Sequence, residues 1–329
     1  MLVTGGAGFI GSHLAEFYLK RGDEVYVIDD LSTGTKENIE SVRQACPGAG
    51  GRFFVVYDTI LNRDKILELI GTCDLVLHMA AAVGVQYILD NPLNSIVTNI
   101  QGTKLVLELC DKFRKKVVIA STSEVYGKRS NDGNLFLETD DCIYGPSIKS
   151  RWSYAAGKLM DEFTSLAYHR VKQLPVIIVR LFNTVGPRQT GRYGMVVPRF
   201  VQQAIRGDPL TVYGNGQQTR TFTHVKEAVQ CIVKLAEETR AVGQVVNVGG
   251  VEEVSILELA RRIKKMTNSS SEIQLIPYDE AYPQDFEDMQ RRVPSTEKLR
   301  KIIGTAPKLS LDNILADIVQ SFKQSALAA

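Results

Sequence analysis

The chain has 329 residues, of which 44% are hydrophobic and 23% are charged. That length allows a large α/β domain with a smaller lobe. The formal net charge of +2 gives no reason to expect a nucleic-acid or anionic-membrane partner.

The first half of the chain alternates short apolar runs with amphipathic stretches, which indicates a doubly wound parallel sheet. Beyond about residue 181, prolines and glycines interrupt the pattern, and residues 245–250 are predicted to return to the sheet. We therefore predict an α/β fold with a smaller C-terminal lobe and a ligand site at the carboxyl ends of the strands. Strands are expected at 2–4, 25–29, 53–57, 75–79, 117–121 and 176–181, and helices at 11–21, 63–70, 92–112, 153–171, 256–266 and 311–322.

A glycine-rich turn follows the first predicted strand and opens the first helix. Gly5, Gly8 and Gly11 have the spacing G-x-x-G-x-x-G, with Phe9 and Ile10 inside the turn. Because glycine has no Cβ, backbone N–H groups can approach a pyrophosphate, and the helix N-terminus adds partial positive charge. The turn therefore predicts a dinucleotide site.

Acidic and small residues end the next strands. A carboxylate at Asp29 can accept both ribose hydroxyls and repels a 2′-phosphate, so it favours NAD over NADP. Asp58 can meet the adenine edge or act as a turn or cap residue. The small Ala80 lets the backbone pass close to the cofactor, whereas His78 is interpreted as structural.

Tyr154 and Lys158 lie one helical turn apart on the same face. A free tyrosine has a pKa near 10, which an ammonium and the positive nicotinamide ring would lower. Tyr154 could then take a hydroxyl proton while the carbon gives its hydride to NAD⁺. A Tyr–Lys pair is common on helix surfaces, so the combination with the glycine turn is what favours the catalytic interpretation.

The segment Ser-Thr-Ser-Glu-Val-Tyr-Gly at residues 121–127 follows a predicted strand at the height expected for the substrate. Thr122 can hydrogen-bond the reacting hydroxyl. Ser123 and Glu124 would lie beside the neighbouring carbons. We therefore place all three among the candidate catalytic residues.

These motifs, with residues 180–187 (Arg-Leu-Phe-Asn-Thr-Val-Gly-Pro) and 218–222 (Gln-Thr-Arg-Thr-Phe), resemble the extended short-chain dehydrogenase/reductase family over nearly the whole chain. The resemblance implies a Rossmann domain that binds NAD tightly and recycles it, and a lobe that binds a nucleotide sugar. It assigns 1–181 plus about 222–250 to the first, and about 182–221 plus 251–329 to the second. It further implies that Asn183, Arg220 and Arg292 bind a UDP diphosphate, that Tyr213 borders the uracil, and that helices around 92–112 and 153–171 form a homodimer.

Within that family the chain is most similar to UDP-glucuronate decarboxylases. Thr122-Ser123-Glu124 matches their Thr-Ser-Glu, and residues 149–154 are similar to the segment before their catalytic tyrosine. Residues 292–295 resemble a late segment that closes their site, with Val293 in place of a basic residue.

The resemblance implies an enzyme that oxidises the sugar at C4 and decarboxylates UDP-glucuronate to UDP-xylose or to the 4-keto pentose. Three alternatives stay open: a UDP-hexose or UDP-hexuronate 4-epimerase, a UDP-sugar dehydratase, and a non-catalytic protein that senses NAD.

The remaining sequence features bear on location and metals. No apolar run approaches the roughly 20 residues of a membrane helix, and a turn that begins at Gly5 leaves no room for a cleavable leader. Five scattered cysteines favour the reducing cytoplasm. Four histidines without ligand spacing predict no metal site. We therefore expect a cytoplasmic protein with no membrane partner.

Overall fold

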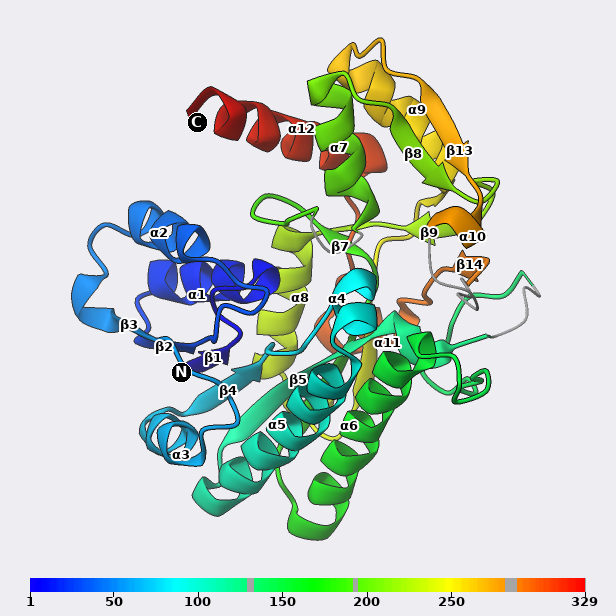
Figure 1. Cartoon of the computed structure of the whole chain (residues 1–329). Coiled ribbons are helices and arrows are strands. Elements are labelled where there is room, and N and C mark those ends of the chain that lie inside the picture. The colour runs from blue at the N-terminus through cyan, green and yellow to red at the C-terminus, as the bar shows by residue number, and fades with distance from the viewer. Residues whose placement is uncertain (129–132, 192–194, 282–288, 329) are drawn as a thin grey trace.

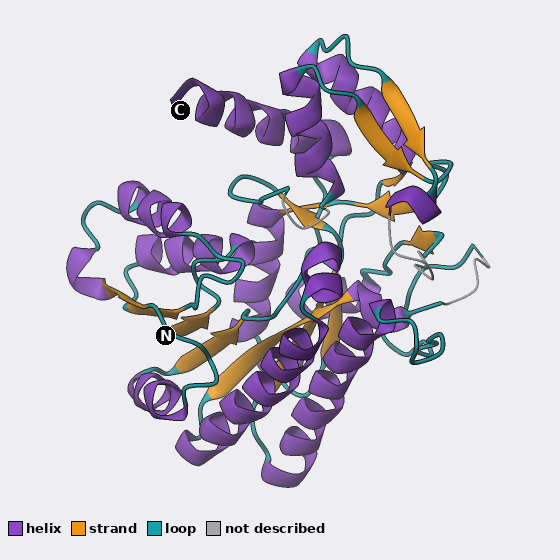
Figure 2. Cartoon of the chain, in the orientation of Figure 1, coloured by secondary structure: helices purple, strands orange, loops and turns teal. Residues whose placement is uncertain are grey.

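The computed structural model describes residues 1–128, 133–191, 195–281 and 289–328. In this part of the chain, seven strands form one sheet in the order β11-β6-β5-β4-β1-β2-β3, and every adjacent pair is parallel (Figures 1 and 2). The strands are β1 (Leu2–Thr4), β2 (Val25–Ile28), β3 (Phe53–Val56), β4 (Leu75–His78), β5 (Lys116–Thr122), β6 (Val176–Leu181) and β11 (Val245–Val248). The strands expected in the first half of the chain are confirmed to within one residue at each end.

Helices cover both faces of this sheet because successive strand residues point to opposite sides. Val3 belongs to one hydrophobic core and Leu2 to the other. The first core is closed by α1 (Phe9–Arg21), α2 (Lys36–Ala45), α8 (Val225–Glu237) and α11 (Glu297–Ile303). The second is closed by α3 (Arg63–Thr72), α5 (Pro92–Phe113) and α6 (Arg151–Lys172). This is the doubly wound arrangement that the sequence predicts.

A second lobe has a hydrophobic core of its own, which includes Phe200, Leu210, Leu259 and Leu315. Its main helices are α7 (Val196–Arg206), α9 (Ile256–Thr267) and α12 (Leu311–Ala328), and its parallel strand pair is β8 (Leu210–Tyr213) and β13 (Ile273–Ile276). The predicted division of the chain into domains remains a prediction. The late helix α11 packs with the first core through Leu299 and Ile302.

Short elements connect the two lobes and carry much of the site. A small sheet orders β12 (Glu253–Ser255), β9 (Thr219–Thr221) and β14 (Arg291–Arg292), and a second pairs β7 (Thr184–Val185) with β10 (Thr223–His224). The remaining helical segments are α4 (Val85–Asp90), α10 (Tyr278–Ala281), η1 (Gly50–Arg52), η2 (Ser123–Tyr126) and η3 (Thr239–Ala241).

Two kinds of feature are absent from the residues that the structure describes. No helix among them has the length and apolarity needed to cross a bilayer. Nor do they contain a group of three or more His, Cys, Asp or Glu side chains that could hold a metal ion.

Candidate active site

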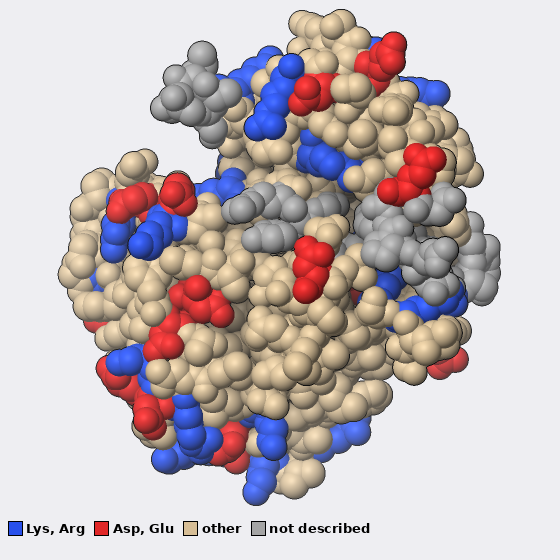
Figure 3. Space-filling model, viewed as in Figure 1, with Lys and Arg blue, Asp and Glu red and all other residues tan. Residues whose placement is uncertain are grey.

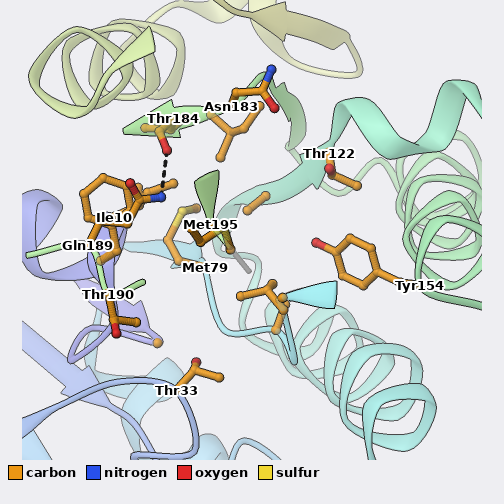
Figure 4. A pocket seen from close by; sticks show the side chains of 18 of the residues that line it. Ile10, Thr33, Met79, Thr122, Tyr154, Asn183, Thr184, Gln189, Thr190 and Met195 are labelled. Atoms are coloured by element: carbon orange, nitrogen blue, oxygen red, sulfur yellow. Dashed lines mark hydrogen bonds between the residues drawn. The ribbon is translucent and has the colours of Figure 1, made fainter. Parts of the chain in front are cut away.

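A cavity of about 470 Å³ lies along the carboxyl ends of the sheet strands, where β1 is flanked by β4 and β2. Figure 3 shows the face of the molecule that is hollowed between the two lobes. Figure 4 shows Thr122 and Tyr154 on one side of the cavity, with the Tyr154 hydroxyl pointing into it, and Ile10 and Gln189 on the other. Every predicted site residue except Lys158 lines this cavity: Gly5, Gly8, Phe9, Ile10, Gly11, Asp29, Asp58, Ala80, Thr122, Ser123, Glu124, Tyr154, Asn183, Tyr213, Arg220 and Arg292.

The glycine turn is too tight for side chains at two of its positions. Gly5 has φ +69°, and a Cβ there would lie 2.8 Å from the Cα of Ala80. A Cβ at Gly11 would lie 2.1 Å from the carbonyl oxygen of Gly5. α1 begins directly after Gly8, which provides no side-chain cap. The first N–H groups of α1 are therefore available at the cavity as donors for an anion.

Asp29 and Asp58 end neighbouring strands but differ in their partners. Asp29 is 7% exposed, and its carboxylate accepts hydrogen bonds from the backbone N–H groups of Ala7, at 2.9 Å, and Leu31, at 2.8 Å. Burial raises the pKa of the Asp29 carboxyl, and these two bonds oppose that rise. Asp58 accepts from the N–H of Thr59 and from Asn62 Nδ2, both at 2.7 Å. Asp58 therefore has the turn role that the sequence left open, and its contact with adenine stays a prediction.

Tyr154 and Lys158 of α6 differ in their electrostatic surroundings. Lys158 is 2% exposed, and its Nζ lies 2.9 Å from the carboxylate of Asp161. Burial raises the pKa of Tyr154 above its ordinary value, and the charges of Glu124 and Asp161 raise it further. A hydrogen bond with Thr122 acts in the opposite direction. This raised pKa is that of the chain alone, so the lowering expected from the ammonium together with the nicotinamide ring of bound NAD⁺ stays a prediction.

Glu124 is held between two arginines. Its Oε1 lies 2.5 Å from Arg292 Nη1, and its Oε2 lies 3.3 Å from Arg151 Nη2. Burial opposes ionisation, yet the charges of Arg292 and Arg151 outweigh it and lower the pKa of Glu124 to about 2. The side chain is therefore a carboxylate at neutral pH. Its backbone N–H donates to Thr122 Oγ1 at 3.2 Å, which places it beside the predicted reacting centre.

The small sheet brings the predicted phosphate-binding residues together. Arg292 of β14 is paired in register with Arg220 of β9. Arg292 Nη2 also donates to Asn183 Oδ1 at 2.6 Å, and Asn183 Nδ2 donates to the carbonyl of Thr221 at 2.8 Å. Val293, which departs from the family pattern, is 3% exposed. A buried position suits an apolar side chain better than a basic one.

Tyr213 lies in the second lobe with its ring under a guanidinium group. Arg199 of α7 has its Cζ 4.0 Å from the centre of that ring, a cation–π contact. Nearby, Gln218 Nε2 donates to the Tyr213 carbonyl at 3.1 Å and to the Tyr278 hydroxyl at 3.0 Å. This end of the cavity therefore offers aromatic faces and polar groups.

Sequence reasoning missed many lining residues, including these four: Arg151, Arg188, Arg199 and Tyr278. Signals existed for two of them. Arg151 lies inside the segment 149–154, and Arg188 directly follows the motif that ends at Pro187. Arg188 forms an ion pair with Glu16 of α1, which holds it at the cavity wall. Arg199 and Tyr278 lie outside every motif, so only the folded lobe reveals them.

Comparison with known proteins places these features in context. The family model described as GDP-mannose 4,6 dehydratase matches residues 2–318. The UDP-N-acetyl-alpha-D-glucosaminuronate decarboxylase of Bacillus cytotoxicus is 40% identical over 324 residues, which cover 98% of this chain and 97% of that protein. UDP-glucuronic acid decarboxylase 1 of Arabidopsis thaliana is 35% identical over 99% of this chain and 70% of its own length.

Solved structures agree with this picture. The UDP-glucuronic acid 4-epimerase of Bacillus cereus, in complex with UDP-glucuronic acid and NAD, superposes with a TM-score of 0.86 at 30% identity. The match covers 98% of this chain and 99% of the epimerase. The predicted fold and the resemblance to nucleotide-sugar enzymes are confirmed by these matches.

Proposed function

Because the chain belongs to the GDP-mannose 4,6 dehydratase family, we propose that it is an NAD-dependent enzyme that decarboxylates a UDP-hexuronate after transient oxidation at C4. UDP-glucuronate, converted to UDP-xylose, is the first candidate substrate. UDP-N-acetylglucosaminuronate is the second, because the B. cytotoxicus relative bears that name. The observation that carries the proposal is the Glu124 carboxylate held by Arg292 and Arg151, beside Thr122 and Tyr154.

The residues at the glycine turn fit an adenine dinucleotide. A Cβ at Gly5 or Gly11 would meet backbone atoms. The turn is therefore tight, and these two positions have no room for a side chain. Asp29 offers a carboxylate to the ribose, and the N-terminus of α1 offers N–H groups to the pyrophosphate. Bound NAD⁺ would supply the acceptor for the C4 hydride and would return that hydride at the end, so it would be recycled rather than consumed.

The chain's own residues would divide the rest of the chemistry. Tyr154 takes the proton of the C4 hydroxyl, and Thr122 hydrogen-bonds the same oxygen and fixes its position. Once C4 is a ketone, the C5–C6 bond can break with loss of CO₂, because the ketone accepts the electron pair. A proton from water is then added at C5, because Glu124 is ionised, and Ser123 and Glu124 would lie beside that carbon.

The arginines would bind the anionic parts of the substrate. A guanidinium group can bind a carboxylate or a phosphate through two parallel hydrogen bonds. Arg292 and Arg151 lie at Glu124, whose charge they exceed together, and Arg220 lies next to Arg292 in register. This surplus of positive charge suits a substrate with a diphosphate and a carboxylate. Tyr213 would border the uracil.

The three alternatives are weaker for specific reasons. A 4-epimerase needs the same Tyr154 and cofactor but has no need of Glu124 between two arginines. A dehydratase would need an acid that protonates the leaving hydroxyl, and Ser123 would be a poor acid. A protein that only senses NAD would not need Tyr154, Lys158 and Thr122 together.

We further propose that the protein is a cytoplasmic homodimer. Five free cysteines suit a reducing compartment.

Helices α5 and α6 pack side by side on one face of the sheet (Figure 1). They expose large apolar side chains, with Leu93 at 74%, Met160 at 50% and Phe163 at 59% exposure. A two-fold contact between these helices would bury those residues. Sedimentation of wild type and Phe163→Glu tests this: a dimer should become a monomer in the variant.

The proposed reaction is tested by CO₂ release from UDP-glucuronate and from UDP-N-acetylglucosaminuronate. Wild type should release CO₂ from one of them, and Glu124→Gln should lose most of that activity. Glu297→Gln, at an exposed position on α11, is the control and should match wild type. Full CO₂ release by Glu124→Gln would remove Glu124 from the proposed mechanism, whereas epimerised sugar without CO₂ release by wild type would favour the 4-epimerase instead.

A further inference from the structure

Asn247 is a fully buried amide that the proposed reaction does not use. It interrupts the valines of β11, and its side chain forms hydrogen bonds with three separate segments of the chain. Its Oδ1 accepts from the Tyr126 hydroxyl at 2.7 Å, and its Nδ2 donates to the carbonyls of Phe136, at 2.9 Å, and Ser295, at 3.4 Å. A buried amide is costly unless it is paired, so these bonds hold the three segments to β11.

The first of these segments carries Glu124. Tyr126 is the last residue of η2, two positions after Glu124. Its ring lies 4.7 Å from the Cζ of Arg180, and Arg180 is itself fixed by two hydrogen bonds to Glu162, at 3.0 and 2.8 Å. Tyr126 is therefore held at its ring by Arg180 and at its hydroxyl by Asn247, which fixes the place of η2 on the sheet.

The other two segments hold the chain directly after Arg292. The Phe136 N–H donates to the carbonyl of Val293 at 2.8 Å, and the Ser295 N–H donates to the carbonyl of Phe136 at 2.9 Å. Asn247 Nδ2 binds the carbonyls of both Phe136 and Ser295. Because a carbonyl can only accept, this contact also fixes the orientation of the amide and makes its oxygen the acceptor for the first segment.

The end of β11 also packs directly against the segment that follows β14. A Cβ at Gly249 would lie 2.5 Å from Pro294 Cγ. The 2.5 Å contact between Glu124 Oε1 and Arg292 Nη1 requires η2 and β14 to keep a fixed separation, and Asn247 is bonded to the continuation of both. We propose that Asn247 is a positioning residue that sets the distance between Glu124 and Arg292. Its importance for turnover rests on the proposed function, in which these two charges lie beside the substrate.

A cycle of two substitutions tests the positioning role without any measurement of activity. Urea unfolding at pH 7 is compared for wild type, Glu124→Gln, Asn247→Leu and the double variant. Substitutions at independent sites have additive effects on stability, whereas coupled sites do not. The fall in urea midpoint caused by Glu124→Gln should shrink to about half or less in the Asn247→Leu background, because the ion pair is no longer held together. A fall of the same size in both backgrounds would overturn the proposal.

Asn99 provides the matched control. It is a second buried amide, 3% exposed, and it hydrogen-bonds both backbone groups of Ala82, at 2.7 and 3.3 Å. Asn99→Leu should lower the stability as well, but Glu124→Gln should have its full wild-type effect in that background. The same shrinkage in Asn99→Leu would show that the loss of any buried amide suffices, which would also overturn the proposal.

A milder variant serves if Asn247→Leu does not fold. Tyr126→Phe removes only the hydroxyl that binds Asn247, and it takes the place of Asn247→Leu in the same cycle with the same expected result. The cycle stands even if no decarboxylation is found, so its failure and that of the proposed function are distinguishable. Where CO₂ is released, kcat of the folded variant should fall about 10- to 100-fold with an unchanged Kd for NAD⁺. An unchanged kcat would remove the role in turnover.

Discussion

Arg292 Nη1 lies 2.5 Å from Glu124 Oε1, although 168 residues separate them in the chain. The contact joins β14, which pairs with β9, to η2, the segment that directly follows β5. Strand β14 therefore completes a site that begins at η2. Its Arg292 joins the carboxylate of Glu124 to the side chain of Asn183.

The first prediction concerns Tyr154. Tyr154→Phe removes the hydroxyl that points into the cavity, so turnover should fall by roughly 10²- to 10⁴-fold. The thermal unfolding midpoint should change little, because the ring is retained. Tyr168→Phe, on the same helix, should behave as wild type. Normal turnover by Tyr154→Phe would remove it as the base.

The second prediction concerns the pH dependence of stability. The pKa of Glu124 is lowered from 4.5 to about 2 in the folded chain, so its charge stabilises the fold above pH 4.5. That contribution is lost as the pH falls from about 4.5 toward 2. Wild type should therefore be more stable to urea than Glu124→Gln at pH 7, and the difference should shrink by pH 3. The same difference at both pH values would contradict the ion-pair assignment.

The third prediction compares two glycines. Gly11→Ala places a methyl group 2.1 Å from the Gly5 carbonyl oxygen, whereas a Cβ at Gly48 meets no atom within 4 Å. Gly11→Ala should unfold at lower temperature and lose NAD binding, because the turn must open. Gly48→Ala should match wild type in both measurements. Normal NAD affinity in Gly11→Ala would show that this turn does not hold the cofactor.

The fourth prediction concerns cofactor choice. Asp29→Asn removes the charge that repels a 2′-phosphate, so the preference for NAD over NADP should fall at least about tenfold. Titration calorimetry with both cofactors measures it. Asp30 is exposed, and its Oδ1 accepts from the N–H of Ser32 at 2.9 Å, so Asp30→Asn should have a smaller effect. A larger effect at Asp30 would transfer the ribose contact to that residue.

The sequence predicts the sheet well because its strands are short apolar runs between turns. The boundaries of β1 and β6 are those expected, and α5 differs by one residue. Helix α7 was not predicted, since Pro198 lies inside it and glycines flank it. Helix α8 was also not predicted, although no proline or glycine lies within residues 217–242. Pairings such as β8 with β13 join segments about 60 residues apart, so local periodicity carries no information about them.

The same distinction holds at the site. Gly5, Asp29 and Tyr154 lie in motifs with fixed spacing, and the structure places all three at one cavity. The ion pair of Lys158 with Asp161 was not predicted, because an aspartate on a helix is usually a solvated charge and only burial makes it a partner. The contact of Arg151 with Glu124 likewise depends on how α6 and η2 pack.

The most direct test of the central claim is mass spectrometry of the nucleotide sugar after incubation of the purified protein with NAD⁺ and either UDP-glucuronate or UDP-N-acetylglucosaminuronate. The proposed function predicts a product lighter than its substrate by one CO₂ for at least one of the two. An unchanged mass with a shifted retention time would mean epimerisation. An unchanged mass and retention time for both substrates would contradict the assignment of a UDP-hexuronate decarboxylase.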